Sequence, residues 1–270
     1  MTGFATFWQG PLTGLIRACL ASFPARGAEL TLFSYEARLD LPEGVAWRDA
    51  REICPDSGLM QRYRVDGRPS LATFSDRFRY EMMAREDLCW VDVDMLALRP
   101  GGLDQPLIWG CQAEAKGKAL INNAVLRLPT GSPVLADMLA RARAAEGQEI
   151  GWGAIGPYLL TEIAEAHGLY ASAAGPERFY PVAPDEFWRL FDPRAHDAVA
   201  EAAARSEMAH LWSELLRRMD YDFDAAPPMG SYLYEQFSEI GALGGFARMC
   251  ERSEIAALIA RWNASAPEAP

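Results

Sequence analysis

The most informative segment of the sequence is Cys89-Trp90-Val91-Asp92-Val93-Asp94-Met95. It begins with apolar residues, as a buried strand does, and two carboxylates two positions apart follow. Because side chains alternate along a strand, Asp92 and Asp94 are expected to point the same way. Ligands bind at the carboxyl ends of strands in open α/β sheets. Two like charges there repel unless a cation lies between them, so the pattern predicts a site for Mg²⁺ or Mn²⁺. A plainer interpretation is that both acids lie on the surface and cap the following turn.

The residues around this stretch alternate between strand-like and helix-like segments. Strands are predicted at about 4–8, 29–35, 88–93, 107–111 and 124–128, with a polar hairpin through Glu114 and Lys118. Helices are predicted at about 12–20, 70–85, 132–146, 158–167, 193–205 and 253–262, and residues 49–68 form a polar loop with short helices. This alternation predicts a Rossmann-like, mixed but mostly parallel sheet covered by helices, with a helical C-terminal elaboration. We expect one domain over residues 1–264 and a disordered tail over 265–270.

Composition excludes several classes of function. The 270 residues include 26 Lys and Arg against 37 Asp and Glu, a formal charge of −11. Such a surface repels phosphate backbones and acidic lipids, which argues against nucleic-acid binding. The sequence contains no apolar stretch long enough for a membrane helix, which needs about 18 residues. Its five widely spaced cysteines form no C-x-x-C pair, so we expect reduced thiols and a cytoplasmic location.

A second polar pair precedes the acidic stretch. Asp76 and Arg79 are three residues apart in the predicted helix 70–85, so they share a face, with Tyr80 beside them. That face lies opposite Phe74 and Phe78, which are expected to hold the helix to the core. The pair is either a solvent-exposed ion pair of little energetic weight or a rigid acceptor and donor for a ligand's hydroxyls and phosphates. Spacing alone leaves both interpretations open.

Taken together, these residues resemble a known enzyme family. The run Ser75-Asp76-Arg77-Phe78-Arg79-Tyr80-Glu81-Met82, followed by Trp90-Val91-Asp92-Val93-Asp94, is similar to the sugar-binding region with the DXD motif of retaining glycosyltransferases. The groups most alike are the bacterial capsular-polysaccharide transferases, the Och1-type mannosyltransferases and the α-1,4-galactosyltransferases. The large clostridial glucosylating toxins share the same spacing. Supporting matches are Phe7-Trp8-Gln9-Gly10, Asn122-Asn123-Ala124, Trp152-Gly153 through Gly156-Pro157, and His210-Leu211-Trp212. One departure is Arg85-Glu86-Asp87-Leu88-Cys89, where the family commonly has a Gly-Gly pair.

The resemblance implies a GT-A fold and assigns residues to the nucleotide and metal. Asp94 would bind Mn²⁺ or Mg²⁺ directly, and Asp92 would hold the ribose or a metal-bound water. His210 would be a third metal contact, and Trp212 a lid over the diphosphate. Trp8 would stack on the nucleotide base. Each assignment has a plainer alternative, since a histidine or tryptophan is often only a packed residue.

The resemblance also assigns residues to the donor sugar. Asp76 and Arg79 would hold its hydroxyls, with Tyr80 next to them, and Arg79 would help to neutralise the departing diphosphate. Asn123, and with it Asn122, would face the sugar, although an asparagine in a turn often only satisfies backbone groups.

The function implied is transfer of a hexose from a nucleotide sugar, with a UDP-sugar favoured, to a glycan or glycolipid acceptor. The family's usual role is the synthesis of bacterial surface polysaccharide, at the inner face of the inner membrane. No residue stands out as a covalent nucleophile, and retaining enzymes of this type are commonly thought to use front-face attack, so the resemblance implies retention of configuration without an enzyme-bound intermediate.

Two other functions remain open from the sequence. A haloacid-dehalogenase-type phosphatase also places D-x-D at a strand end, but such proteins usually have Thr or Val where Leu96 stands here. A protein that binds nucleotide sugars or glycans without turnover would use the same binding residues. Turnover of nucleotide sugars or of phosphomonoesters distinguishes the three.

Overall fold

A six-stranded mixed sheet lies at the centre of the molecule, in a computed structural model that describes residues 3–37, 40–113 and 119–265. In order across the sheet the strands are β3 (Val45–Asp49), β2 (Leu30–Ser34), β1 (Phe4–Phe7), β6 (Cys89–Val91), β9 (Ile121–Arg127) and β8 (Ile108–Cys111). Of these six, only β9 runs against the others. The predicted mostly parallel α/β sheet is therefore confirmed.

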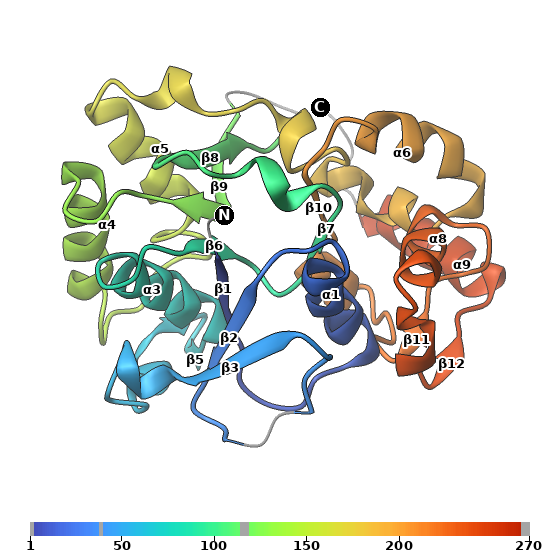
Figure 1. The fold of residues 1–270 in the computed structure, drawn as a ribbon, viewed down its shortest axis with the longest axis horizontal. Coiled ribbons are helices and arrows are strands. Elements are labelled where there is room, and N and C mark those ends of the chain that lie inside the picture. Colours follow the sequence, from blue (N-terminus) through green and yellow to red (C-terminus); the bar gives the residue numbers. More distant parts are fainter. Residues whose placement is uncertain (1–2, 38–39, 114–118, 266–270) are drawn as a thin grey trace.

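Helices cover both faces of this sheet. Figure 1 shows α3 (Leu71–Met83), α4 (Pro133–Ala144) and α5 (Pro157–Ala166) on one side of the strands. On the other side lie α1 (Gly14–Ala25) and the C-terminal helices α6 (His196–Ala203), α8 (Tyr232–Glu239) and α9 (Arg252–Ser265). The two shorter α-helices are α2 (Leu59–Arg62) and α7 (Ser213–Arg218). This arrangement agrees with the expected helical elaboration in the second half of the chain.

Alternation along the strands divides the apolar core in two. Phe4 of β1 packs on the α1 side, whereas Phe7 packs on the α3 side. There the centroid of the Phe7 ring lies 5.3 Å from that of Phe74 and 4.8 Å from that of Phe78. Ser70 begins α3 by accepting a hydrogen bond from the Thr73 amide, as an N-cap serine does. The aromatic contacts therefore fix α3 beside β1, with its polar residues at the end of the sheet where Asp92 lies.

Three small strand pairs complete the structure. They are β4 (Arg64–Val65) with β5 (Arg68–Pro69), β7 (Met95–Ala97) with β10 (Met208–His210), and β11 (Ala225–Ala226) with β12 (Arg248–Met249). Besides the hairpin strands, β3, β7, β10, β11 and β12 were not predicted from the sequence. Part of the polar loop 49–68 is a hairpin with the left-handed residues Asp66 and Gly67 at its tip. The hairpin expected through Glu114 and Lys118 and residues 266–270 of the expected tail lie outside the described residues, and α9 runs to Ser265.

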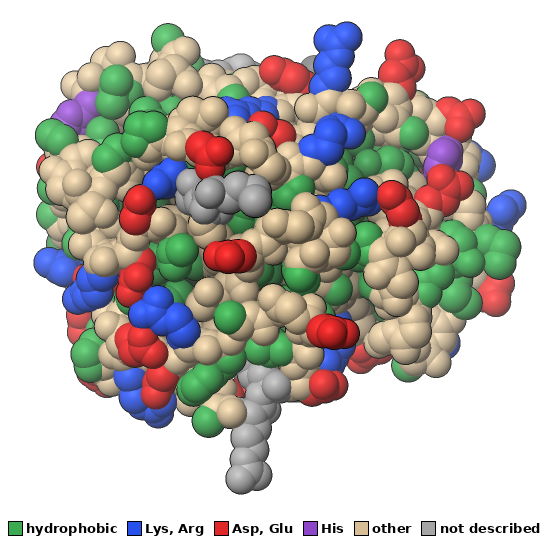
Figure 2. Space-filling view, viewed as in Figure 1, with side chains coloured by type: hydrophobic (Ala, Val, Ile, Leu, Met, Phe, Trp, Pro, Cys, Tyr) green, Lys and Arg blue, Asp and Glu red, His purple; other side chains and the backbone are tan. Residues whose placement is uncertain are grey.

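The surface carries charges of both signs. Figure 2 shows acidic and basic side chains scattered among neutral ones over the face in view. Among the described residues, no helix combines the length and the apolar character that crossing a bilayer requires.

Candidate functional site

The acid pair lies in a turn that joins β6 to β7. The Asp92 amide donates to the Ala124 carbonyl (2.8 Å), and the Asp92 carbonyl accepts from the Met95 amide (3.0 Å). The acids thus follow the last strand residue, Val91, and do not lie within the strand. The two carboxylates do come together, but the turn and not strand alternation is the cause.

The strand pair β7–β10 brings His210 to this turn from a distant part of the sequence. Met95 pairs with His210 in an antiparallel register, and the Leu211 amide donates to the Asp94 carbonyl (3.1 Å). His210 Nε2 then lies 3.2 Å from Asp94 Oδ2, and the Ser213 amide donates to the same oxygen (2.8 Å). The backbone pairing thus fixes the imidazole beside the carboxylate.

Asp92, Asp94 and His210 form a cluster that could hold a metal ion. One ligand atom from each lies within 4.8 Å of the others. The Nδ1 atom of His210 is buried and has no hydrogen-bond partner among the described residues, so a bound ion or ligand would satisfy a polar atom that is otherwise costly to bury. Two carboxylates and an imidazole are compatible with Mn²⁺, and carboxylates with Mg²⁺.

The electrostatics of Asp94 and His210 are coupled. Burial alone raises the pKa of the Asp94 carboxyl, but the charge and hydrogen bond of His210 and the bonds from Ser213 outweigh it and hold that pKa well below its usual range. Burial alone lowers the pKa of His210, yet the negative charge and hydrogen bond of Asp94 raise it above its ordinary value. The pairing with Asp94 thus favours the protonated imidazole, and a metal ion must displace a proton from the nitrogen that it binds.

Arg79 connects the acid pair to α3. Its guanidinium lies 3.1 Å from a carboxylate oxygen of Asp76 and 3.1 Å from one of Asp92. It also lies 4.7 Å from the Trp90 ring centroid and donates to the Asn123 carbonyl (2.5 Å). Asp76 and Arg79 are buried, so the alternative of a solvent-exposed ion pair is wrong. Burial raises the pKa of Asp76 to about 6, although Arg79 opposes this.

The asparagines lie where β9 begins, beside Asp76. Asn123 donates from Nδ2 to Asp76 (2.8 Å) and to the Tyr80 hydroxyl (3.2 Å). Asn122 donates to the Gln112 side chain (2.6 Å) and accepts from the amide of Ala124. Tyr80 is fully buried and donates to the Ile155 carbonyl (2.8 Å), so it positions Asn123 and does not itself line the cavity described below.

Two tryptophans flank the cluster. Trp8 follows β1 and donates its indole N–H to the Pro11 carbonyl (3.2 Å). Trp212 has a left-handed backbone (φ 55°), unusual for a bulky residue, and its ring centroid lies 4.1 Å from that of His210. Its indole N–H donates to the Val182 carbonyl (3.0 Å). Trp212 therefore packs directly on the imidazole of the candidate metal site.

A cavity of about 1010 Å³ opens at this edge of the sheet. Nine of the ten residues singled out in the sequence line it: Trp8, Asp76, Arg79, Asp92, Asp94, Asn122, Asn123, His210 and Trp212. The sequence did not predict the wall made by the β4–β5 hairpin or five charged or aromatic residues at the cavity: Tyr158, Glu214, Arg217, Arg218 and Phe223. Trp152 also lines it and was noted only as part of a supporting match.

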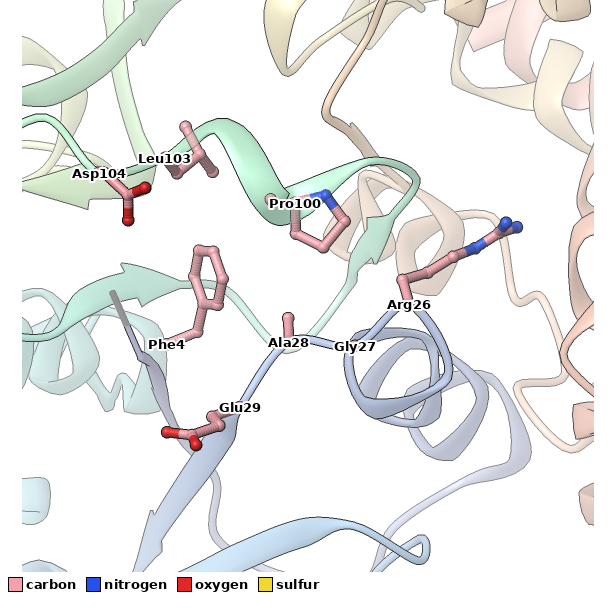
Figure 3. A pocket seen from close by; sticks show the side chains of 9 residues that line it. Phe4, Arg26, Gly27, Ala28, Glu29, Pro100, Leu103 and Asp104 are labelled. Atoms are coloured by element: carbon pink, nitrogen blue, oxygen red, sulfur yellow. The ribbon is translucent and has the colours of Figure 1, made fainter. Parts of the chain in front are cut away.

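A smaller hollow of about 210 Å³ lies elsewhere, beside the start of β1. Figure 3 shows Phe4, Ala28, Pro100 and Leu103 around it. The Arg26 side chain extends away from the other labelled residues and pairs with Glu239. The hollow therefore offers few convergent polar groups, and the chemistry concentrates in the large cavity.

The chain was compared with family models, curated proteins and solved structures. No protein-family model and no curated protein matches the chain. A solved structure titled "PaToxG Glycosyltransferase" is similar at 13% sequence identity and a TM-score of 0.41, over 62% of this chain and 68% of that one. A likeness of this size does not decide the fold, which follows from the strand order and register described above.

Proposed function

We propose that the protein is a metal-dependent retaining glycosyltransferase that moves a hexose from a nucleotide sugar to a glycan or glycolipid acceptor. The observation that carries the proposal is the convergence of Asp92, Asp94 and His210 in a large cavity at the carboxyl edge of the sheet. The DXD resemblance supports it independently of the geometry.

Asp94, Asp92 and His210 would hold Mn²⁺ or Mg²⁺. When bound, the ion would act as a Lewis acid and neutralise charge on the departing diphosphate. Arg79 would add to this indirectly, because it lies beside Asp92 and fixes that carboxylate. Trp212 would keep the imidazole in place through their ring contact.

The order of the strands suggests how the donor lies. Trp8 follows β1, Asp92 follows β6 and Asn123 belongs to β9, so the three lie in this order along the sheet edge. We place the nucleotide base at Trp8, the diphosphate over the acid pair, and the hexose at Asp76 and Asn123. UDP is the favoured nucleotide, from the resemblance alone.

The reaction would break the bond between the anomeric carbon and the diphosphate while positive charge develops on the sugar ring. The acceptor hydroxyl would form the new bond from the same face, which retains the configuration, and its proton would pass to the leaving phosphate oxygen. The Asp76 carboxylate is held by Arg79 and Asn123, so it is better suited to binding sugar hydroxyls than to attack. Positioning and electrostatics would then supply most of the rate.

The resemblance and the expected reduced cysteines favour a cytoplasmic enzyme that works on precursors of bacterial surface polysaccharide, peripheral to the inner membrane. A phosphatase of the haloacid-dehalogenase type is less well supported, because its first aspartate must be a free nucleophile. Here an Asp92 oxygen accepts from the Trp90 indole (2.7 Å) and lies beside Arg79.

A donor assay tests the proposal. The protein is incubated with UDP- and GDP-hexoses and Mn²⁺, and the released nucleoside diphosphate is measured. We expect release that stops with EDTA and returns with Mn²⁺, and that falls on the order of 10³-fold in Asp94→Asn, because the metal contributes several kcal/mol to the barrier.

The matched control is Asp197→Asn, since Asp197 is an exposed acid on α6 outside the residues that line the cavity. Normal turnover in Asp94→Asn would overturn the metal assignment. Release from phosphomonoesters alone would favour the phosphatase, and metal-dependent binding of nucleotide sugars without turnover, with an acceptor panel present, would favour a binding protein.

A further inference from the structure

Two large aromatic side chains are exposed at the rim of the candidate cavity. Trp152 is 48% exposed and Tyr158 is 58% exposed, and both line the cavity. The Tyr158 ring packs under Gly153, whose backbone has a positive φ of 72°; a side chain there would meet the ring at 3.3 Å. The two aromatics therefore belong to one locally ordered turn, at the start of α5.

This turn lies against the residues proposed to hold the donor sugar. A Cβ atom on Gly156 would approach the Asp76 carboxylate to 2.9 Å and the Asn123 amide to 3.4 Å. Tyr80, which holds Asn123, also donates to the Ile155 carbonyl of the same turn. The aromatic residues thus lie next to the sugar end of the site, whereas Trp8 lies toward the opposite end, after β1.

The surroundings of Trp152 are polar and charged. The Arg218 guanidinium lies 5.6 Å from its ring centroid and also donates to Glu214 (3.0 Å). A pyranose ring has an apolar C–H face and a rim of hydroxyls, so it combines a surface that packs on an aromatic ring with groups that hydrogen-bond to such neighbours. Arg218 and Glu214 pair with each other but remain 49% and 30% exposed, so a purely apolar ligand would remove water from them without replacing its hydrogen bonds.

We propose that Trp152 and Tyr158 form a stacking platform for a neutral hexose of the acceptor, an inference that rests on the proposed glycosyltransferase function. The hexose packs its C–H face on the aromatic rings, and Arg218 and Glu214 bind its hydroxyls. The acceptor is on this account a neutral glycan, whose hydroxyl is thereby held next to the donor sugar.

The test measures oligosaccharide binding directly, without a donor. Maltose, cellobiose, lactose and chitobiose, with their longer homologues, are titrated by saturation-transfer NMR. We expect at least one to bind with a Kd near or below about 1 mM, and Trp152→Ala to weaken it about tenfold. Trp152→Phe, which keeps an aromatic face, should restore most of the affinity.

The matched control is Trp47→Ala, because Trp47 is 37% exposed on the edge strand β3 and lies outside the residues that line the cavity. Its binding curve should equal that of the unmodified protein. Absence of binding by every sugar, or equal binding by Trp152→Ala, would overturn the platform.

A competition experiment separates the platform from the donor site. UDP with Mn²⁺ should leave oligosaccharide binding in place, because the two ligands occupy opposite ends of the cavity. Mutual exclusion would show that the aromatic residues serve the donor and would overturn the inference. Failure of the proposed function would be seen in a different experiment. The unmodified protein would then show no metal-dependent breakdown of nucleotide sugars, whether or not it binds oligosaccharides.

Discussion

Residues of α3 take part in two groups of charged side chains, and the two groups differ in the balance of positive and negative charge. In the first, which we call the Glu81 group, one carboxylate meets three guanidinium groups. Arg77 contacts it from the same helix, Arg85 lies 2.6 Å away, and Arg143 of α4 lies 2.9 Å away. Burial alone raises the pKa of Glu81, but the three arginines outweigh it and lower that pKa. The Glu81 group therefore has three positive charges for one negative charge.

The second group, here the acid group, has the opposite balance. Asp76, Asp92 and Asp94 share one guanidinium, that of Arg79, and one imidazole, that of His210. Even with His210 protonated, three negative charges face two positive ones. The acid group opens on the large cavity, which the Glu81 group does not line.

Buried charge by itself does not mark a functional site. The Glu81 group is satisfied within the fold and ties α3 to α4, so its role is structural. The acid group has a surplus of negative charge beside open space, which a cation would neutralise. Substitutions in either group should therefore have different effects on stability and on turnover.

Removal of the Glu81 charge should destabilise the fold without touching the chemistry. In Glu81→Gln, Arg77, Arg85 and Arg143 would face one another around a neutral amide. We expect a loss of about 3 kcal/mol in the free energy of unfolding, measured by urea denaturation. Turnover per folded molecule should stay normal; a selective loss of turnover at unchanged stability would contradict the structural role.

The geometry of Asp76 and Asp92, and with it donor turnover, should depend on Arg79. Lysine cannot bridge Asp76 and Asp92 as a guanidinium does, so Arg79→Lys should lower kcat/KM for the donor by roughly 30-fold, about 2 kcal/mol. Arg143→Lys in the Glu81 group is the matched change and should stay near normal. Equal losses in the two variants would remove the distinction between the groups.

Metal affinity should depend on pH through His210. Asp94 raises the pKa of this imidazole, and a metal must displace its proton. Below that raised pKa, the apparent affinity for Mn²⁺ should fall by up to about tenfold per pH unit; above it, the affinity should level off.

Calorimetric titration with Mn²⁺ across pH measures this profile. His196 is the control, because its pKa is also raised, by hydrogen bonds to Asp197 and Glu235, but it lies on α6 outside the residues that line the cavity. In His196→Gln the affinity for Mn²⁺ should depend on pH as in the unmodified protein, whereas in His210→Gln this dependence should disappear. A profile that survives in His210→Gln would rule out the imidazole as a ligand.

Much of the sheet could be predicted from the sequence because β1, β2 and β6 are apolar runs bounded by turn residues. The strands β7 and β10 could not, because each is a short segment whose only strand partner is the other, in a distant part of the sequence. Their pairing is what brings His210 to Asp94, so geometry at this point depends on tertiary contacts more than on local propensity.

The candidate site shows the same limit. Asp92 and Asp94 stood out because carboxylates after an apolar strand are unusual, although the turn that joins them was not predicted. The burial of Asp76 with Arg79 could not be read from their spacing, which suits an exposed pair equally well. The Glu81 group was missed because Arg143 comes from another helix, 62 residues further along the chain.

Bound manganese can be counted, and the count shows whether the acid group is a metal site. Electron paramagnetic resonance detects free Mn²⁺, and its signal should fall by one equivalent per chain when the protein is added with UDP. Glu81→Gln should bind the same one equivalent while folded, and Asp94→Asn should bind none. One equivalent bound by folded Asp94→Asn, with unchanged affinity, would contradict the account of the acid group as a metal site.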